Sequence, residues 1–166
     1  MDHQIFQTIN GFAGRISWLD WLGVFFALYF VYLWAAYIAW LWFEKKFRSR
    51  VYLAFASAAV SYYIVVVLKQ LFGRPRPYEV LPVHQLITDT ERGLSFPSGH
   101  AVVFFSLAFA FYNTKYFKPF FVLACLGSIA RVFVGVHYPS DIVVGAFIGG
   151  GTAWSLKRLF KKHFLG

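Results

Sequence analysis

The stretch Phe96–Tyr112, FPSGHAVVFFSLAFAFY, joins a polar corner to an apolar run. Ser98 is a favoured N-cap residue, so we expect a helix to begin directly after it. The first N–H groups of a helix have no intrahelical partner and carry the positive end of the helix dipole, which suits them to an anion. His100, in the first turn, would stand where it can exchange a proton with that anion. A Ser-Gly pair before a helix is usually only a cap, so this stretch alone does not define a site.

The composition of the chain is that of a membrane protein. Of the 166 residues, 59% are hydrophobic and 14% are charged, whereas a soluble domain carries roughly 25% charged residues. We therefore predict an all-α polytopic membrane bundle that forms a single domain, residues 1–166. The net charge of +9 does not indicate nucleic-acid binding, because Lys and Arg lie between apolar runs. Loop charge bias and anionic lipids account for them.

The apolar runs predict an N-terminal amphipathic helix followed by five membrane spans. Residues Met1–Ser17 place apolar side chains at helical spacing among polar ones, as in a helix that lies at the membrane interface. The predicted spans are Trp18–Phe43, Val51–Phe72, Phe96–Tyr112, Pro119–Val136 and Ile142–Leu156. Small residues that allow close helix packing interrupt the last span, namely Gly145, Gly149, Gly150 and Gly151.

Five spans assign the polar connections to two sides of the membrane. The end of the second span, the start of the third and the corner between the fourth and fifth share one face. Ten of the 16 Lys and Arg residues belong to the other face, in the turns 44–50 and 115–118 and in the tail 157–166. The positive-inside rule makes that face, with the C-terminus, cytoplasmic. The corner at Ser98 would then face the periplasm or the cell exterior.

Six ionisable side chains lie at or near helix ends on this outer face: Lys69, Arg76, His100, Arg131, His137 and Asp141. A charge at membrane depth is costly unless it is paired or faces a polar cavity, which makes each a candidate for function. Lys69 or Arg76 alone can be explained by snorkelling to the headgroups. The whole set, drawn from three separate corners, indicates one site.

These residue types suit a phosphoryl group. Cations and helix N–H groups can surround phosphate oxygens and neutralise their charge during an in-line displacement. An imidazole can attack phosphorus and form a phosphohistidine. Asp141, four residues after His137, is spaced to accept the other ring N–H and fix the tautomer. His100 can protonate the departing oxygen.

The same residues are compatible with two other kinds of site. The two histidines and Asp141 are possible zinc ligands, but three neighbouring cations favour an anion over a metal. Ser98 is a conceivable nucleophile of a Ser/His/Asp hydrolase. At a helix cap beside cations, Ser98 is better placed to bind phosphate.

Three motifs together resemble the signature of the type-2 phosphatidic-acid phosphatase superfamily. They are Lys69-x6-Arg76-Pro77, Pro97-Ser98-Gly99-His100 and Arg131-x5-His137-x3-Asp141, and they occupy residues 69–77, 97–100 and 131–141. Members are membrane enzymes that remove phosphate from lipid phosphates and diphosphates without a metal. The resemblance therefore implies no cofactor and no metal site.

The resemblance also implies a role for each motif residue. His137 would be the nucleophile, Asp141 its partner and His100 the general acid. The phosphate would be bound by Lys69, Arg76, Ser98, Gly99 and Arg131. The chain departs from the family at Ala130, where a serine is usual, and so lacks one hydroxyl donor to the phosphate.

The small size, the amphipathic N-terminus and the outward site look most like bacterial undecaprenyl-diphosphate phosphatases, which release inorganic phosphate and undecaprenyl phosphate. Phosphatases of phosphatidylglycerophosphate, phosphatidic acid or lipid A are alternatives, and 73–95 is expected to contribute to the head-group pocket. Its polar residues Tyr78, Glu79, His84, Asp89, Glu91 and Arg92 are better explained as a solvated loop than as a gate. The expected partners are the lipid substrate and the bilayer, with no nucleic acid and no obligate protein. A lipid-binding or lipid-flipping protein is the alternative from another class, although binding alone needs no His/His/Asp set.

Overall fold

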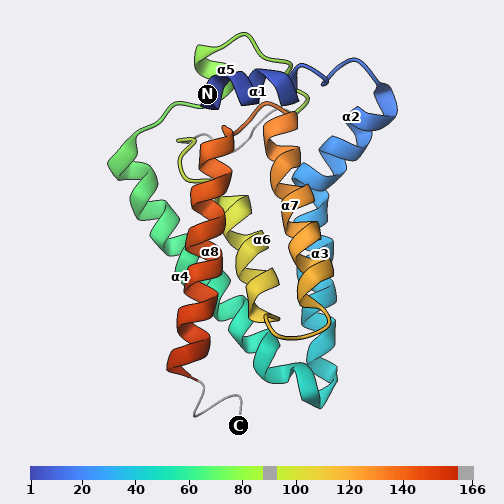
Figure 1. The fold of residues 1–166 in the computed structure, drawn as a ribbon, viewed down its shortest axis with the longest axis vertical. Helices are drawn as coiled ribbons and strands as arrows, with labels where there is room; N and C mark the ends of the chain where they lie inside the picture. The colour runs from blue at the N-terminus through green and yellow to red at the C-terminus, as the bar shows by residue number, and fades with distance from the viewer. Residues whose placement is uncertain (88–92, 161–166) are drawn as a thin grey trace.

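The computed structural model describes residues 1–87 and 93–160, where all regular elements are helices (Figure 1). They are α1 (Asp2–Asn10), α2 (Ser17–Val24), α3 (Phe30–Trp40), α4 (Arg48–Phe72), α5 (Pro77–Val80), α6 (Gly99–Ala110), α7 (Phe117–Phe133) and α8 (Pro139–Leu159). A π-helical turn, Phe25–Tyr29, joins α2 to α3. The 3-10 turns Leu41–Phe43 and Lys45–Phe47 join α3 to α4. The all-α prediction is confirmed for these ranges; Asp89, Glu91 and Arg92 lie outside them.

The long helices form a bundle with α6 at its centre. Helix α6 packs against α4, α7 and α8, and it touches α3. Helices α1 and α5 lie across one end of the bundle, and the connection from α6 to α7 lies at the other end (Figure 1). The polar corner before α6 is therefore placed under α1, between the end of α4 and the start of α8.

Glycines in α8 allow the close approach of α6. A Cβ atom at Gly149 would lie 2.3 Å from the carbonyl oxygen of Val102, and one at Gly145 would lie 2.9 Å from that of Ser98. Only a hydrogen atom fits at these positions. The packing role predicted from the sequence is thus confirmed for Gly145 and Gly149, but it is wrong for Gly151, where a Cβ would meet nothing within 4 Å.

Aromatic side chains fill the core between α3, α6 and α7. The Trp34 ring stacks on Phe104 with centroids 5.8 Å apart and meets the edge of Phe120 at 5.6 Å. Phe104 and Phe111 are fully buried. Offset and edge-to-face aromatic pairs contribute beyond their buried area, so this cluster fixes the half of the bundle away from α1.

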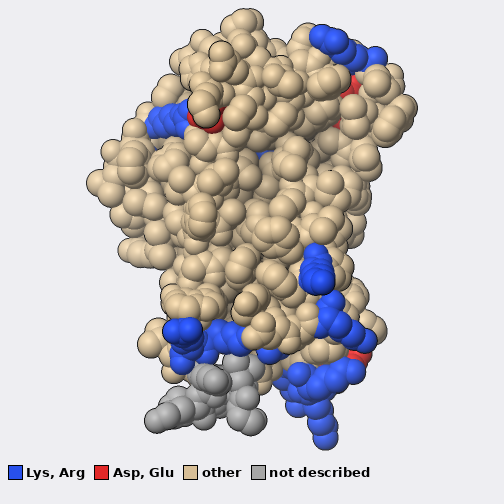
Figure 2. Space-filling view, viewed as in Figure 1, with Lys and Arg blue, Asp and Glu red and all other residues tan. Residues whose placement is uncertain are grey.

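Two helical segments among the described residues, Ser17–Phe43 and Lys45–Val80, are long and apolar enough to cross a membrane. Helix α6 is apolar but has 12 residues, which extend about 18 Å, against a hydrocarbon core of about 30 Å. The prediction of five spans therefore stays a prediction. Most visible Lys and Arg side chains gather at the end opposite α1, and the middle of the bundle is almost free of charge (Figure 2).

The N-terminal helix ends earlier than predicted. Helix α1 stops at Asn10 rather than continuing to Ser17, because turns at 11–15 redirect the chain into α2. Phe6 is buried, and the Asn10 amide donates to the carbonyl oxygens of His84 at 2.9 Å and Phe133 at 2.8 Å. Helix α1 is therefore fastened to the bundle. Its location at a membrane interface stays a prediction.

Candidate active site

The three motif-bearing segments meet at the α1 end of the bundle. Lys69 comes from the last turn of α4, Gly99 and His100 from the first turn of α6, and His137 from the corner between α7 and α8. A cavity of about 270 Å³ lies between α3, α4 and α6. It is lined by Val31, Tyr32, Tyr62, Lys69, Gly99, His100 and Val103.

The corner between α7 and α8 fixes Asp141 through helix capping. Pro139 is the first residue of α8, as the sequence predicts, since its missing N–H costs nothing there. Asp141 occupies the third position, and its Oδ2 accepts the backbone N–H of Tyr138 at 2.8 Å. The same oxygen lies 3.3 Å from Nδ1 of His137. Both His137 and Asp141 are fully buried, so this geometry is shielded from solvent.

The opposite nitrogen of the His137 ring is also buried. Within the described residues, the buried Nε2 atom has no hydrogen-bond partner. Burial lowers the pKa of His137 to about 3; the hydrogen bond with Asp141 opposes this shift, and the charges of Arg131 and Arg76 reinforce it. The ring is therefore neutral at physiological pH. With Asp141 holding the proton on Nδ1, Nε2 carries a lone pair.

The arginines predicted to bind phosphate are both buried and held by backbone carbonyls. Arg76 donates from Nε to Gly93 at 2.9 Å and from Nη1 to Val136 at 3.3 Å. Arg131 donates from Nη1 to Ala27 at 3.1 Å. These carbonyl contacts orient the two guanidinium groups.

The lysine and the arginines act on the imidazoles together. The ammonium of Lys69 donates to the carbonyl oxygen of Leu94. The charges of Arg131, Arg76 and Lys69 all act on His100, and the two arginines also act on His137. The predicted residues thus gather in one strongly cationic region, which suits a phosphoryl group.

The start of α6 has the expected cap. Ser98 is the N-cap residue, and its hydroxyl accepts the N–H of Ala101 at 3.4 Å, which confirms the capping prediction. The backbone N–H of Ser98 donates to the carbonyl oxygen of Asp141 at 3.1 Å. A Cβ at Gly99 would lie 3.1 Å from the ring of Tyr62. The start of α6 therefore packs closely against the first turn of α8 and against α4.

Sequence reasoning missed two side chains that contact Asp141. Ser95 donates to Oδ2 of Asp141, and its hydroxyl lies 3.5 Å from Nδ1 of His137. Arg74 donates from Nη1 to Oδ1 of Asp141 at 2.8 Å. Arg74 stands two residues before a motif arginine, a signal that was available; nothing in the local sequence distinguishes Ser95.

Ala130, which replaces the usual serine of the family, packs in an apolar cluster. It is buried with Ala27, Phe133 and Val134 as neighbours in that cluster. Its methyl group therefore contributes to packing beside Arg131, with no hydroxyl to offer an anion.

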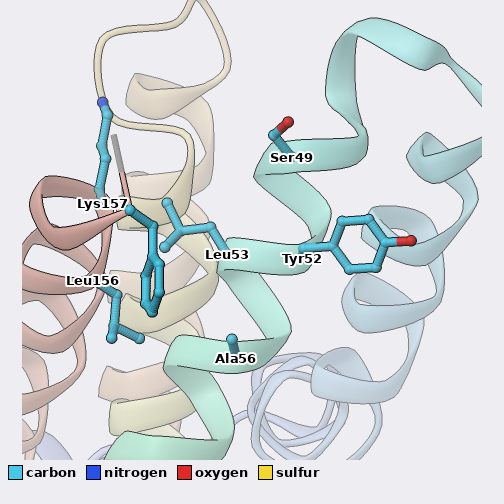
Figure 3. A pocket seen from close by; sticks show the side chains of 7 residues that line it. Ser49, Tyr52, Leu53, Ala56, Leu156 and Lys157 are labelled. Carbon is cyan, nitrogen blue, oxygen red and sulfur yellow. The ribbon is translucent and has the colours of Figure 1, made fainter. Parts of the chain in front are cut away.

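A second cavity lies between the start of α4 and the end of α8, at the end of the bundle away from α1 (Figure 3). It encloses about 210 Å³ and is almost entirely apolar. Its lining residues are Ser49, Tyr52, Leu53, Ala56, Leu156, Lys157 and Phe160. It contains none of the predicted site residues, whereas Lys69, Gly99 and His100 line the first cavity.

The chain belongs to the PAP2 superfamily, whose sequence pattern matches residues 50–165. It is thus an integral membrane lipid phosphatase, a hydrolase. The undecaprenyl-diphosphatase BcrC of Bacillus subtilis is 30% identical over 161 residues, which are 90% of this chain and 81% of the relative. The family resemblance predicted from the motifs is confirmed.

Two solved structures share the fold. LpxE from Aquifex aeolicus superposes with a TM-score of 0.81 at 28% identity and covers 94% of both chains. A PAP2-type phosphatidylglycerolphosphate phosphatase from Bacillus subtilis gives 0.70 at 23% identity, over 97% of this chain and 87% of that one. The helix bundle is thus the PAP2 membrane phosphatase fold.

Proposed function

We propose that this phosphatase hydrolyses undecaprenyl diphosphate to undecaprenyl phosphate and inorganic phosphate through a phosphohistidine on His137. The observation that carries the mechanism is the His137 ring, with Nδ1 at Asp141 and a buried Nε2 that lacks a hydrogen-bond partner in the described residues. The named activity of the Bacillus subtilis relative supports the substrate.

The form of the cavity supports a substrate that arrives from the bilayer. Helix α4 leans away from α3 toward the α1 end of the bundle (Figure 1). Tyr32 and Tyr62, which line the cavity between these helices, are 72% and 51% exposed on the apolar outer surface. A lipid chain can therefore lie along these tyrosines while its phosphate reaches Lys69 and His100.

In the first step, Nε2 of His137 attacks the terminal phosphorus and a nitrogen–phosphorus bond forms. The phosphorus–oxygen bond to the leaving group breaks, and His100 gives its proton to the departing oxygen. A bound phosphate offsets the charges of Lys69, Arg76 and Arg131, so His100 holds a proton more readily with substrate present than without it. Asp141 stabilises the positive charge that develops on the His137 ring.

In the second step, water attacks the phosphohistidine. His100 takes a proton from that water, the nitrogen–phosphorus bond breaks, and inorganic phosphate leaves with His137 and His100 restored. Throughout, the phosphoryl oxygens are bound by Lys69, Arg76, Ser98, Gly99 and Arg131. Side-chain cations and backbone N–H groups supply the charge stabilisation, so the proposed reaction needs no metal.

The proposed orientation places the site on the outer face, with five crossings and a cytoplasmic C-terminus. The charge asymmetry between the two ends of the bundle supports it (Figure 2). In a Cys125→Ala background, a cysteine at Val80 should react with a membrane-impermeant maleimide in intact cells. A cysteine at Lys45 should react only after lysis. The reverse pattern contradicts the orientation.

A substrate panel tests the proposed activity. Full-length protein in detergent should release phosphate from undecaprenyl diphosphate faster than from phosphatidylglycerophosphate, phosphatidic acid or lipid A, and chelator should not change the rate. His137→Ala should abolish release, whereas His84→Ala, at an exposed histidine outside the site, should not. Preference for another lipid would reassign the substrate, and unchanged release by His137→Ala would remove the mechanism.

A further inference from the structure

Helix α1 reaches the active-site corner through Asp2. Its Oδ1 accepts the backbone N–H of Ser140 at 2.9 Å, and its Oδ2 accepts the Ser140 hydroxyl at 2.6 Å. Ser140 is the second residue of α8, where backbone N–H groups have no partner within the helix. Asp2 thus caps the helix that carries Asp141 from a position 138 residues earlier in the chain.

Arg74 connects the two carboxylates. Its Nη2 donates to Oδ2 of Asp2 at 2.7 Å, and its Nη1 donates to Oδ1 of Asp141 at 2.8 Å and to the Ser140 hydroxyl at 2.7 Å. The guanidinium lies 3.8 Å from the ring centroid of Tyr138, and that ring also contacts the rings of His3 and Phe6 in α1. Hydrogen bonds therefore hold the edge of the Arg74 guanidinium, and the Tyr138 ring packs against its face.

The charges in this network bear on His137. Asp2 and Arg74 are about three-quarters buried, with side-chain exposures of 28% and 27%, and Asp141 is fully buried. Although burial alone would raise it, hydrogen bonds from Arg74 and Ser140 hold the pKa of Asp2 below its usual value. Two carboxylates thus share one guanidinium. Without Asp2, the full charge of Arg74 would act on Asp141 and weaken its stabilisation of a positive His137 ring.

We propose that Asp2 is a positioning residue for the reaction and that α1 is part of the catalytic apparatus. Through Arg74 and Ser140, Asp2 holds the Asp141 carboxylate in the orientation that aligns His137. The inference rests on the roles proposed for His137 and Asp141. It assigns to α1 a task beyond lying at a membrane surface.

The test compares Asp2→Asn with Asp20→Asn in the full chain. Asp20 is outside the site, and its carboxylate accepts the backbone N–H of Gly14 at 2.9 Å, so its variant makes the same charge change elsewhere. Asp2→Asn should lower kcat about tenfold, the scale of one charge-assisted hydrogen bond, and change KM less than about twofold. Asp20→Asn should leave both unchanged.

Inhibition by orthovanadate separates positioning from folding. Vanadate mimics the transition state of phosphoryl transfer, and an inhibition constant does not depend on the fraction of folded enzyme. The constant should rise severalfold in Asp2→Asn and recover in Asp2→Glu. An unchanged constant and kcat in Asp2→Asn would overturn the proposal.

A double-variant comparison identifies the route. In an Arg74→Gln/Ser140→Ala background, adding Asp2→Asn should cause a much smaller loss of kcat than in the wild type, because its side-chain links to Asp141 are already gone and only the bond from the Ser140 backbone N–H remains. An additional tenfold loss would show that Asp2 acts elsewhere. If His137→Ala is active, the proposed mechanism fails; if His137→Ala is inactive while Asp2→Asn matches the wild type, only the positioning role fails.

Discussion

Nδ1 of His137 lies 3.3 Å from Oδ2 of Asp141, four residues later at the start of α8. The same carboxylate oxygen also accepts the N–H of Tyr138 and the hydroxyl of Ser95. A helix cap thereby fixes the tautomer of the candidate nucleophile. Capping and catalysis can be separated by substitutions that preserve one of these contacts and remove the other.

Asp141→Asn tests that separation. Asp141 is the third residue of α8, and the side-chain oxygen of asparagine can still accept the N–H of Tyr138 there, so the start of α8 should be kept and the protein should stay folded. The amide cannot stabilise a positive imidazole as a carboxylate does, and kcat should fall by roughly 10²–10⁴-fold. Phosphate-release kinetics and thermal unfolding in detergent measure the two effects. Activity within about twofold of wild type would contradict the assigned role.

Arg131→Lys tests whether a planar fork is needed in the cationic region. Lysine keeps the charge but cannot donate to Ala27 and to a phosphate in the same fixed geometry. We expect kcat/KM to fall about 10- to 100-fold, with weaker inhibition by inorganic phosphate. Arg158→Lys, at the opposite end of the bundle, is the control and should behave as the wild type.

The packing of α8 on α6 can be tested with two glycines of one helix. Gly149→Ala would bring a methyl group against the carbonyl oxygen of Val102 and should destabilise the protein by about 1–3 kcal/mol. Gly151→Ala meets open space and should be neutral or stabilising by about 0.5–1 kcal/mol. Unfolding midpoints in a denaturant series distinguish them. Equal effects would show that the helices are not in such close contact.

The burial of neutral His137 predicts a loss of stability in acid. Its pKa is about 3 in the folded chain and about 6.5 when exposed, so between these values the unfolded chain binds the extra proton. Stability should therefore fall as pH drops below about 6.5, by up to about 1.4 kcal/mol per pH unit from this group. His137→Asn does not titrate and should show a smaller loss between pH 7.5 and 4.5. Parallel losses in both proteins would contradict the buried neutral state.

The sequence predicted the helices and the family well, because both depend on local pattern. Long apolar runs define helices whatever their neighbours, and Pro139 or Ser98 marks a helix start by its own chemistry. The contacts of Asp2 depend on tertiary structure, since its partners Arg74 and Ser140 are 72 and 138 residues away. Ser95 lies beside Asp141 for the same reason. No local sequence signal identifies Asp2 or Ser95, so their contacts with the site could be found only in the folded structure.

Direct detection of the covalent intermediate tests the central claim. Enzyme mixed with undecaprenyl diphosphate carrying a labelled terminal phosphate should be quenched in alkaline detergent, where a phosphohistidine survives, and the labelled peptide sequenced. Label on His137, absent in His137→Asn and retained in His84→Ala, is the predicted result. Label on Ser98, or rapid phosphate release by His137→Asn, would contradict the account.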